Sequence, residues 1–212
     1  MSEYVSFPEL DWQVFGWESE ISLPSWKGFQ ERGGAYGSLS SNLEAGETPA
    51  LPDVEAGGTP ALPDVEAGET PALPGSNQPD GSVVALMVLA AGDEEDGPMP
   101  EQEDAFKYLM THEHAVHMSV LCGIHEHYCA MQSKHGKELM PDIGDLEELI
   151  GLSTVHILPV AKDGIAYIGF ELGCVWEEEH GLGVMTHRDR VVEVGGADTA
   201  FTEWIAEGDG GS

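Results

Sequence analysis

Carboxylates and imidazoles gather in one short segment of this sequence. Residues 177–181 read Glu-Glu-Glu-His-Gly, and His187 follows shortly after. Such a cluster at the mouth of a β-hairpin could hold a divalent metal ion or carry out acid–base chemistry. The metal ligands would be Glu179, His180 and His187, and a wider binding site would add Trp176 and Glu177.

The same residues also fit a purely structural role. Glu179 and His180 would then fix an irregular turn by hydrogen bonds, while Gly181 and Gly183 would supply positive φ angles. We favour this structural interpretation, so we assign no catalytic residue and expect no cofactor. Cys174 is expected to be inert packing rather than a nucleophile.

A second group of histidines lies in residues 112–117, which read His-Glu-His-Ala-Val-His. The zinc-protease pattern His-Glu-x-x-His does not fit, because the fourth residue after His112 is Val116. On a helix His117 would point about 140° away from His112. Two pairs do share a helix face and could bind metal weakly, namely His114 with His117 and His125 with Cys129. We favour the alternative that these helix histidines are solvated or partly buried.

The segments around the acidic loop alternate with the period of two that is typical of β-strands. Lys162-Asp163-Gly164 and Arg188-Asp189 have the chemistry of turns between such strands. The expected elements are strands at 155–160, 165–176, 182–187 and 190–194, followed by a closing helix at 197–206. The expected inward face of the second strand consists of Ile168, Phe170, Leu172, Cys174 and Trp176.

The first half of the chain supplies the elements that would pack against these strands. Large aromatic residues in the first thirty positions predict short strands or turns, and residues 83–89 predict a strand. An apolar stripe predicts one long helix over residues 100–135. A second helix at 146–150 has Asp145 and Glu148 at capping-box spacing. The sequence therefore predicts an α+β fold, an antiparallel meander with one long helix and a C-terminal helix packed on it.

Residues 43–75 are an internal repeat of eleven residues, beginning Glu-Ala-Gly at positions 44, 55 and 66. Two prolines in each full unit exclude a continuous helix, and each unit has little apolar surface to bury. We expect a disordered, Pro-rich insertion. Residues 1–42 and 76–206 would then form a single domain, and residues 207–212 a disordered tail.

Charge is the strongest feature of the composition. The formal net charge is −31, with only 8 lysines and arginines. Because phosphate backbones and anionic lipids are bound through basic residues, we expect neither a nucleic-acid nor a membrane partner. The functional interpretations are attraction to a basic protein or capture of cations. The alternative is that the charge serves only solubility, or matches a host with an acidic proteome.

Several features indicate a cytoplasmic protein. No stretch approaches the roughly 20 apolar residues of a membrane span. The first residues lack the basic and apolar regions of a secretory signal. The three cysteines do not suggest a disulfide framework, which fits a reducing compartment. The oligomeric state is not specified by the sequence.

Residues 169–184, from Gly169 through Trp176 and His180 to Val184, resemble a bacterial family known only as a domain of unknown function. Its signature is Gly-Phe-x-Phe-x-Cys-x-Trp-Asp-x-Glu-His-Gly-x-Gly-Val. This sequence departs from it at Leu172 and Glu177. The resemblance is strongest over residues 140–206 and implies no activity.

Two functional hypotheses follow. The first is a non-enzymatic acidic binding protein. One form of this hypothesis is an immunity-like role, in which the protein masks a basic toxin or enzyme. The second is a metal-dependent or acid–base enzyme that uses Glu177, Glu179, His180 and His187.

Overall fold

The computed structural model describes residues 5–29, 82–92, 97–135, 143–177 and 179–211. The side chains of residues 134 and 135 are outside this description. The predicted insertion at 43–75 also lies outside the described residues. No helix in the described ranges is both long enough and apolar enough to cross a membrane.

The centre of the fold is a seven-stranded sheet whose strands follow the order of the chain. Five of the six neighbouring pairs of strands are antiparallel, as expected, and β3 and β4 pair in parallel. The α+β meander predicted from the sequence is therefore confirmed, with one parallel pair added. The strands are β1 (Asp11–Gln13), β2 (Gly16–Ser22), β3 (Val83–Leu89), β4 (Ile150–Lys162), β5 (Ile165–Cys174), β6 (Leu182–His187) and β7 (Arg190–Gly195).

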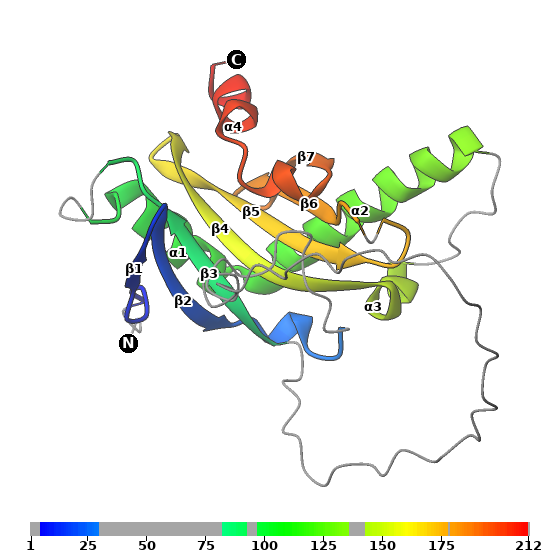
Figure 1. Cartoon of the computed structure of the whole chain (residues 1–212), viewed down its shortest axis with the longest axis horizontal. Helices are drawn as coiled ribbons and strands as arrows, with labels where there is room; N and C mark the ends of the chain where they lie inside the picture. The colour runs from blue at the N-terminus through cyan, green and yellow to red at the C-terminus, as the bar shows by residue number, and fades with distance from the viewer. Residues whose placement is uncertain (1–4, 30–81, 93–96, 136–142, 178, 212) are drawn as a thin grey trace, which may run out of the picture.

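The parallel pair arises because the helices connect β3 to β4. A parallel pair needs a crossover that returns the chain to the same end of the sheet. Here the crossover contains α1 (Pro100–Thr111), α2 (Glu113–His135), η4 (Ile143–Asp145) and α3 (Leu146–Leu149). Figure 1 shows α1 and α2 crossing one face of the sheet, with α4 on the opposite side.

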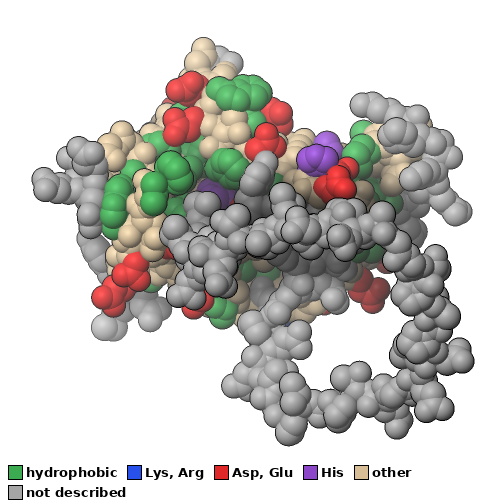
Figure 2. All heavy atoms as spheres, viewed as in Figure 1, with side chains coloured by type: hydrophobic (Ala, Val, Ile, Leu, Met, Phe, Trp, Pro, Cys, Tyr) green, Lys and Arg blue, Asp and Glu red, His purple; other side chains and the backbone are tan. Residues whose placement is uncertain are grey.

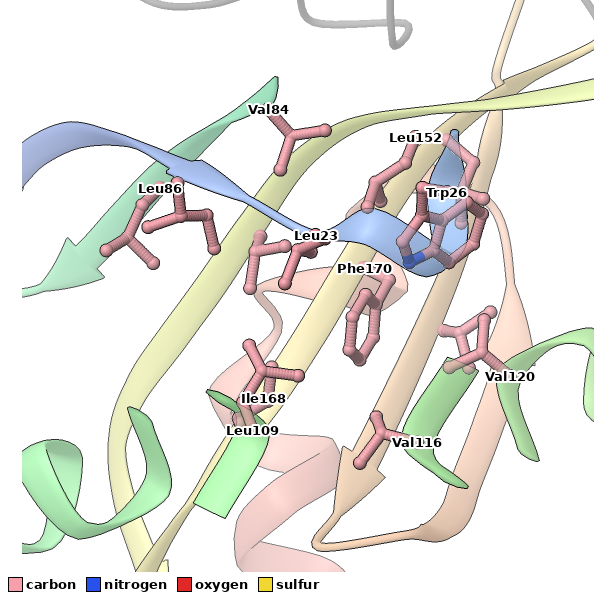
Figure 3. Packing of buried hydrophobic residues seen from close by; sticks show 14 of the residues in the cluster. Leu23, Trp26, Val84, Leu86, Leu109, Val116, Val120, Leu152, Ile168 and Phe170 are labelled. Atoms are coloured by element: carbon pink, nitrogen blue, oxygen red, sulfur yellow. The ribbon is translucent and has the colours of Figure 1, made fainter. Parts of the chain in front are cut away.

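The main core lies between the sheet and these two helices. Ile168 and Phe170 of β5 point toward Leu109 of α1 and Val116 of α2 (Figure 3). Leu172 and Cys174 belong to the same buried cluster, so the predicted inward face of β5 is correct from 168 to 174. Trp176 lies beyond the end of the strand, where it is half-buried.

The opposite face of the sheet is covered in part by η5 (Ala197–Ala200) and α4 (Glu203–Gly210). A second buried cluster forms there from Leu158, Tyr167, Met185, Ile205 and Ala206. Close approach of η5 requires glycine in β5, because a Cβ atom on Gly169 would overlap the carbonyl oxygen of Ala200. We call this side of the molecule the η5–α4 face.

The long helix expected over residues 100–135 is present as two consecutive helices, α1 and α2, divided at His112. His112 leaves the helical conformation, with φ −118° and ψ 23°, and separates α1 from α2. Its ring stacks on Tyr108, with the ring centres 4.2 Å apart. α1 packs on β4 and β5 while α2 packs on β6 and β7. A bend at His112 lets the two helices follow a twisted sheet, which a straight helix does not.

Three other element boundaries differ from the expectations. α3 ends at Leu149, and its Asp145 side chain makes no capping hydrogen bond. The closing helix is divided, because residues 201 and 202 leave the helical conformation between η5 and α4. α4 then continues to Gly210, so residues 207–210 are helical rather than part of a tail. The expected turn at Asp163-Gly164 is present, with positive φ angles of 51° and 73°.

Candidate functional site

The acidic loop predicted as a site forms a turn between β5 and β6. The Nδ1 atom of His180 lies 2.7 Å from Oε1 of Glu177, and both side chains are exposed. This hydrogen bond is the main cause that raises the pKa of His180. The amide of Gly181, which has a φ of 61°, donates to the carbonyl oxygen of Glu177 at 2.9 Å. Glu179 is exposed beside them.

The structure does not bring His187 to this loop. His187 ends β6, so the length of that strand, about 20 Å at 3.3 Å per residue, separates it from His180. Its ring is buried, and Nε2 lies 2.9 Å from the carbonyl oxygen of Lys162. Trp176 packs instead against Tyr128 of α2, with ring centres 4.9 Å apart. Among the residues with described positions, no three His, Cys, Asp or Glu side chains gather as a metal site.

His187 belongs to a different polar cluster, which centres on Asp209 of α4. The Asp209 carboxylate accepts hydrogen bonds from Arg190 and from the hydroxyl of Tyr167, the latter at 2.8 Å. Lys162 donates to the Asp209 backbone carbonyl at 2.7 Å, and the His187 ring packs on Tyr167. The Arg190 hydrogen bond is the main cause that lowers the pKa of Asp209 to about 2. This cluster fixes α4 to β4, β5 and β7.

A second polar pair lies inside the η5–α4 face. His156 Nε2 of β4 is 3.0 Å from Oε2 of Glu171 of β5, and both side chains are buried. The Phe201 ring packs against His156, and the buried Nδ1 atom of His156 has no hydrogen-bond partner within the described structure. A carboxylate that orients an imidazole is an arrangement used in acid–base chemistry.

Neither group could be predicted from the sequence, and the reason is the same for both. His156 and Glu171 meet only through the register of β4 and β5, in which Thr154 pairs with Glu171. Asp209 reaches partners that are far away in the sequence. One signal was available, because Glu171 is a charged residue within the apolar run from Ile168 to Leu172.

An acidic hollow lies at the β1–β2 end of the sheet, on the η5–α4 face. It has a volume of about 550 Å³, and four carboxylates line it without a single lysine or arginine. Asp11 and Glu18 are directly opposite each other in the β1–β2 pair. None of the four carboxylates forms an ion pair or hydrogen bond with any other residue whose position is described. The lining residues are Pro8, Glu9, Asp11, Gln13, Glu18, Ser19, Glu20 and Ala85.

The part of this face that the structure describes is strongly acidic. Figure 2 shows acidic side chains over the β1–β2 region, over α4 and beside a histidine near the β5–β6 turn, with no lysine or arginine visible on its described part. Three of the basic residues already have acidic partners. Lys107 pairs with Glu103 and Asp104, and Lys162 and Arg190 pair with Asp209.

Residues 78–201 match the profile of a family described as Domain of unknown function (DUF6985). The chain belongs to this family. The DUF6985 match confirms the resemblance to an uncharacterised family, and it spans β3 to η5, including the His156–Glu171 pair and the 177–181 loop. The acidic hollow lies almost entirely before the match, and α4 lies after it. No curated protein and no solved structure matches the chain significantly.

Proposed function

We propose that this protein is a non-enzymatic binding protein whose acidic η5–α4 face docks a basic protein. The observation that carries the proposal is the hollow with four carboxylates that have no ion-pair partner among the described residues. Like charges directly opposite each other in a sheet are destabilising. The pairing of Asp11 with Glu18 therefore costs the free protein stability, and a cationic partner would relieve that cost.

The whole-chain charge supports the same function. A net charge of −31 attracts a basic partner over a distance, and an acidic concave surface focuses the field on the docking site. Charge complementarity of this kind raises association rates and selects partners more than it raises affinity. An immunity-like role, in which this face masks a basic toxin or enzyme, is one form of the proposal. The proposal keeps the bacterial, cytoplasmic setting expected from the sequence.

The test compares two variants with the same change in net charge. Binding of a fluorescein-labelled octalysine peptide to the full chain is measured by fluorescence anisotropy in low-salt buffer. Glu18→Gln/Glu20→Gln removes two hollow carboxylates, and we expect about three- to tenfold weaker binding. The control Glu126→Gln/Glu147→Gln removes two exposed carboxylates from α2 and α3, on the helix side of the sheet. Equal effects of the two variants, or no binding by the wild-type chain, would contradict the proposal.

The second candidate is an acid–base enzyme, and the buried His156–Glu171 pair is the observation that favours it. The form of this hypothesis that the sequence suggests uses Glu177, Glu179, His180 and His187, with or without a metal ion. The position of His187 at the far end of β6 gives that set no common centre. Elemental analysis of protein made without a histidine tag tests the metal-dependent form. No stoichiometric zinc, manganese or iron would end it.

A further inference from the structure

Trp204 of α4 differs from the other four tryptophans of the chain. Its side chain is 68% exposed, and it has no aromatic partner among the described residues. Trp17 and Trp26 are buried, and Trp12 and Trp176 pack against Trp17 and Tyr128. An exposed tryptophan gains little stability for the fold, but tryptophan is among the residue types that dominate binding energies at interfaces.

The helix that carries Trp204 is held firmly to the sheet. Ile205 and Ala206 are buried in the cluster with Leu158 and Met185. The C-terminal end of α4 is fixed by the hydrogen bonds of Asp209 to Arg190 and Tyr167 and by Lys162 on its carbonyl oxygen. A side chain presented on a fixed element loses less conformational freedom when a partner binds.

The charges beside Trp204 are acidic. Glu203 and Glu207 are exposed on α4, and Glu207 lies three residues from Trp204 and four from Glu203, so all three share one side of the helix. Figure 2 shows hydrophobic surface in the α4 region with acidic side chains around it. Lys162 and Arg190, which contact the C-terminal end of α4, pair with Asp209 instead. We call Glu203, Trp204 and Glu207 the outer face of α4.

We propose that the outer face of α4 binds an arginine side chain of the basic partner, with the guanidinium group stacked on Trp204 and hydrogen-bonded by Glu203 or Glu207. This inference rests on the proposed function and assigns it a specific contact. A cation held over a tryptophan ring is attracted by the ring quadrupole. Two flanking carboxylates add charge-assisted hydrogen bonds.

Arginine fits this surface better than lysine. The guanidinium group is planar, so it stacks on an indole ring while its N–H groups remain free to reach carboxylates at the ring edge. An ammonium group is a compact, strongly hydrated charge that does not stack. A second copy of this chain is a poorer occupant, because its own η5–α4 face would bring more negative charge to Glu203 and Glu207.

The experiment uses the full chain and two labelled peptides of equal charge, one alternating glycine with arginine and one alternating glycine with lysine. Affinities are measured by anisotropy in low-salt buffer. We expect the wild-type chain to prefer the arginine peptide, and Trp204→Ala to weaken arginine-peptide binding about three- to fivefold and to reduce the preference. Trp204→Phe, which keeps an aromatic ring, is expected to bind the arginine peptide with an affinity between those of the wild-type chain and Trp204→Ala. Met118→Ala, which truncates an exposed apolar side chain of α2, is the control and should change nothing.

Four results would overturn the inference. Equal affinity of the wild-type chain and Trp204→Ala, with matching thermal unfolding curves, would remove Trp204 from the interface. A loss of binding confined to Glu18→Gln/Glu20→Gln would place the partner in the hollow, and the proposed function would survive without the α4 contact. A Trp204-dependent dimer in light scattering would make the face a self-association surface. No binding of either peptide by the wild-type chain would overturn both proposals.

Discussion

At the residue scale, Asp209 connects α4 to three strands through its carboxylate and carbonyl groups. Its pKa is lowered from 3.8 to about 2, chiefly by the Arg190 hydrogen bond and with further help from Tyr167. A carboxyl group with a lower pKa in the folded state stabilises the fold at neutral pH. This contribution is complete above the unfolded-state pKa and is lost as the pH falls through the folded-state pKa.

Replacing Asp209 tests this interaction. We expect Asp209→Asn to lower the free energy of unfolding by on the order of 2 kcal/mol at pH 7, because Arg190 and Lys162 lose their anion. The difference from wild type should shrink as the pH falls from about 4 toward 2, where the wild-type carboxylate also becomes protonated. Urea unfolding followed by circular dichroism measures both the difference at pH 7 and its decrease toward pH 2. A difference that stays constant down to pH 2 would contradict the assignment.

His117 of α2 contributes a pH dependence within the physiological range. Its ring is buried against Trp26 and Phe29, and neither nitrogen has a hydrogen-bond partner in the described structure. Burial lowers the pKa of His117, while Glu113 partly opposes the shift and His114 adds to it. Because the unfolded chain binds the proton more readily, His117 should destabilise the fold as the pH falls below about 6.5.

The substitution His117→Leu removes this effect. We expect a gain of about 1 kcal/mol at pH 7.5 from the loss of an unsatisfied buried group, and a larger gain at pH 5.5. His180→Gln is a control with the opposite pH dependence. Glu177 raises the pKa of His180, so protonation of His180 stabilises the fold, and its loss should matter more at pH 5.5 than at pH 7.5. Unfolding curves at the two pH values give the comparison. If His117→Leu shifts stability equally at both, His117 does not take up a proton on unfolding.

A residue's position could be predicted where neighbouring residues in the sequence determine it. The inward positions Phe170 and Cys174 follow from a period of two, so the sequence predicted them. Asp209 and the His156–Glu171 pair depend on tertiary contacts that no local pattern encodes. His187 stands at the far end of the strand that the sequence predicts at 182–187, so its separation from the acidic loop follows from that strand and not from any tertiary contact.

At the element scale, the strands were predicted better than the helices. The strand at 83–89 and both turns at 163 and 188 have the expected positions, because turn residues and alternation act locally. The break at His112 has no glycine or proline to signal it, and it follows from the packing of α1 and α2 on different strands. Likewise, the division between η5 and α4 depends on their contacts with the sheet.

Of the contacts between secondary-structure elements, the packing of η5 on β5 is the one that we expect to be most sensitive to substitution. We expect Gly169→Ala to destabilise the protein by about 3 kcal/mol or more, because its methyl group would overlap the backbone of Ala200. The control is Gly208→Ala on α4, where an added Cβ meets no atom within 4 Å. That change should stabilise the helix by about 0.5 to 1 kcal/mol. Thermal unfolding of both variants checks the pair, and a tolerated Gly169→Ala would contradict the contact.

At the scale of the whole molecule, the charge is organised by the fold. Positions two residues apart on β1 and β2 lie on one side of the sheet, and cross-strand pairing places Asp11 beside Glu18. The described cations lie elsewhere, with Lys162 and Arg190 used to hold α4. The sequence predicted an acidic protein and a basic partner, and it could not predict which face would carry the charge, because that depends on strand register.

The most direct test of this account is the salt dependence of octalysine binding to the wild-type chain and to Glu18→Gln/Glu20→Gln. Screening shortens the reach of exposed charges, so we predict that wild-type affinity falls about tenfold or more between low and physiological salt. The variant, which has fewer charges in the hollow, should show a shallower dependence. Identical salt dependence in both proteins, or binding that salt does not weaken, would contradict an electrostatic docking site at the β1–β2 end of the sheet.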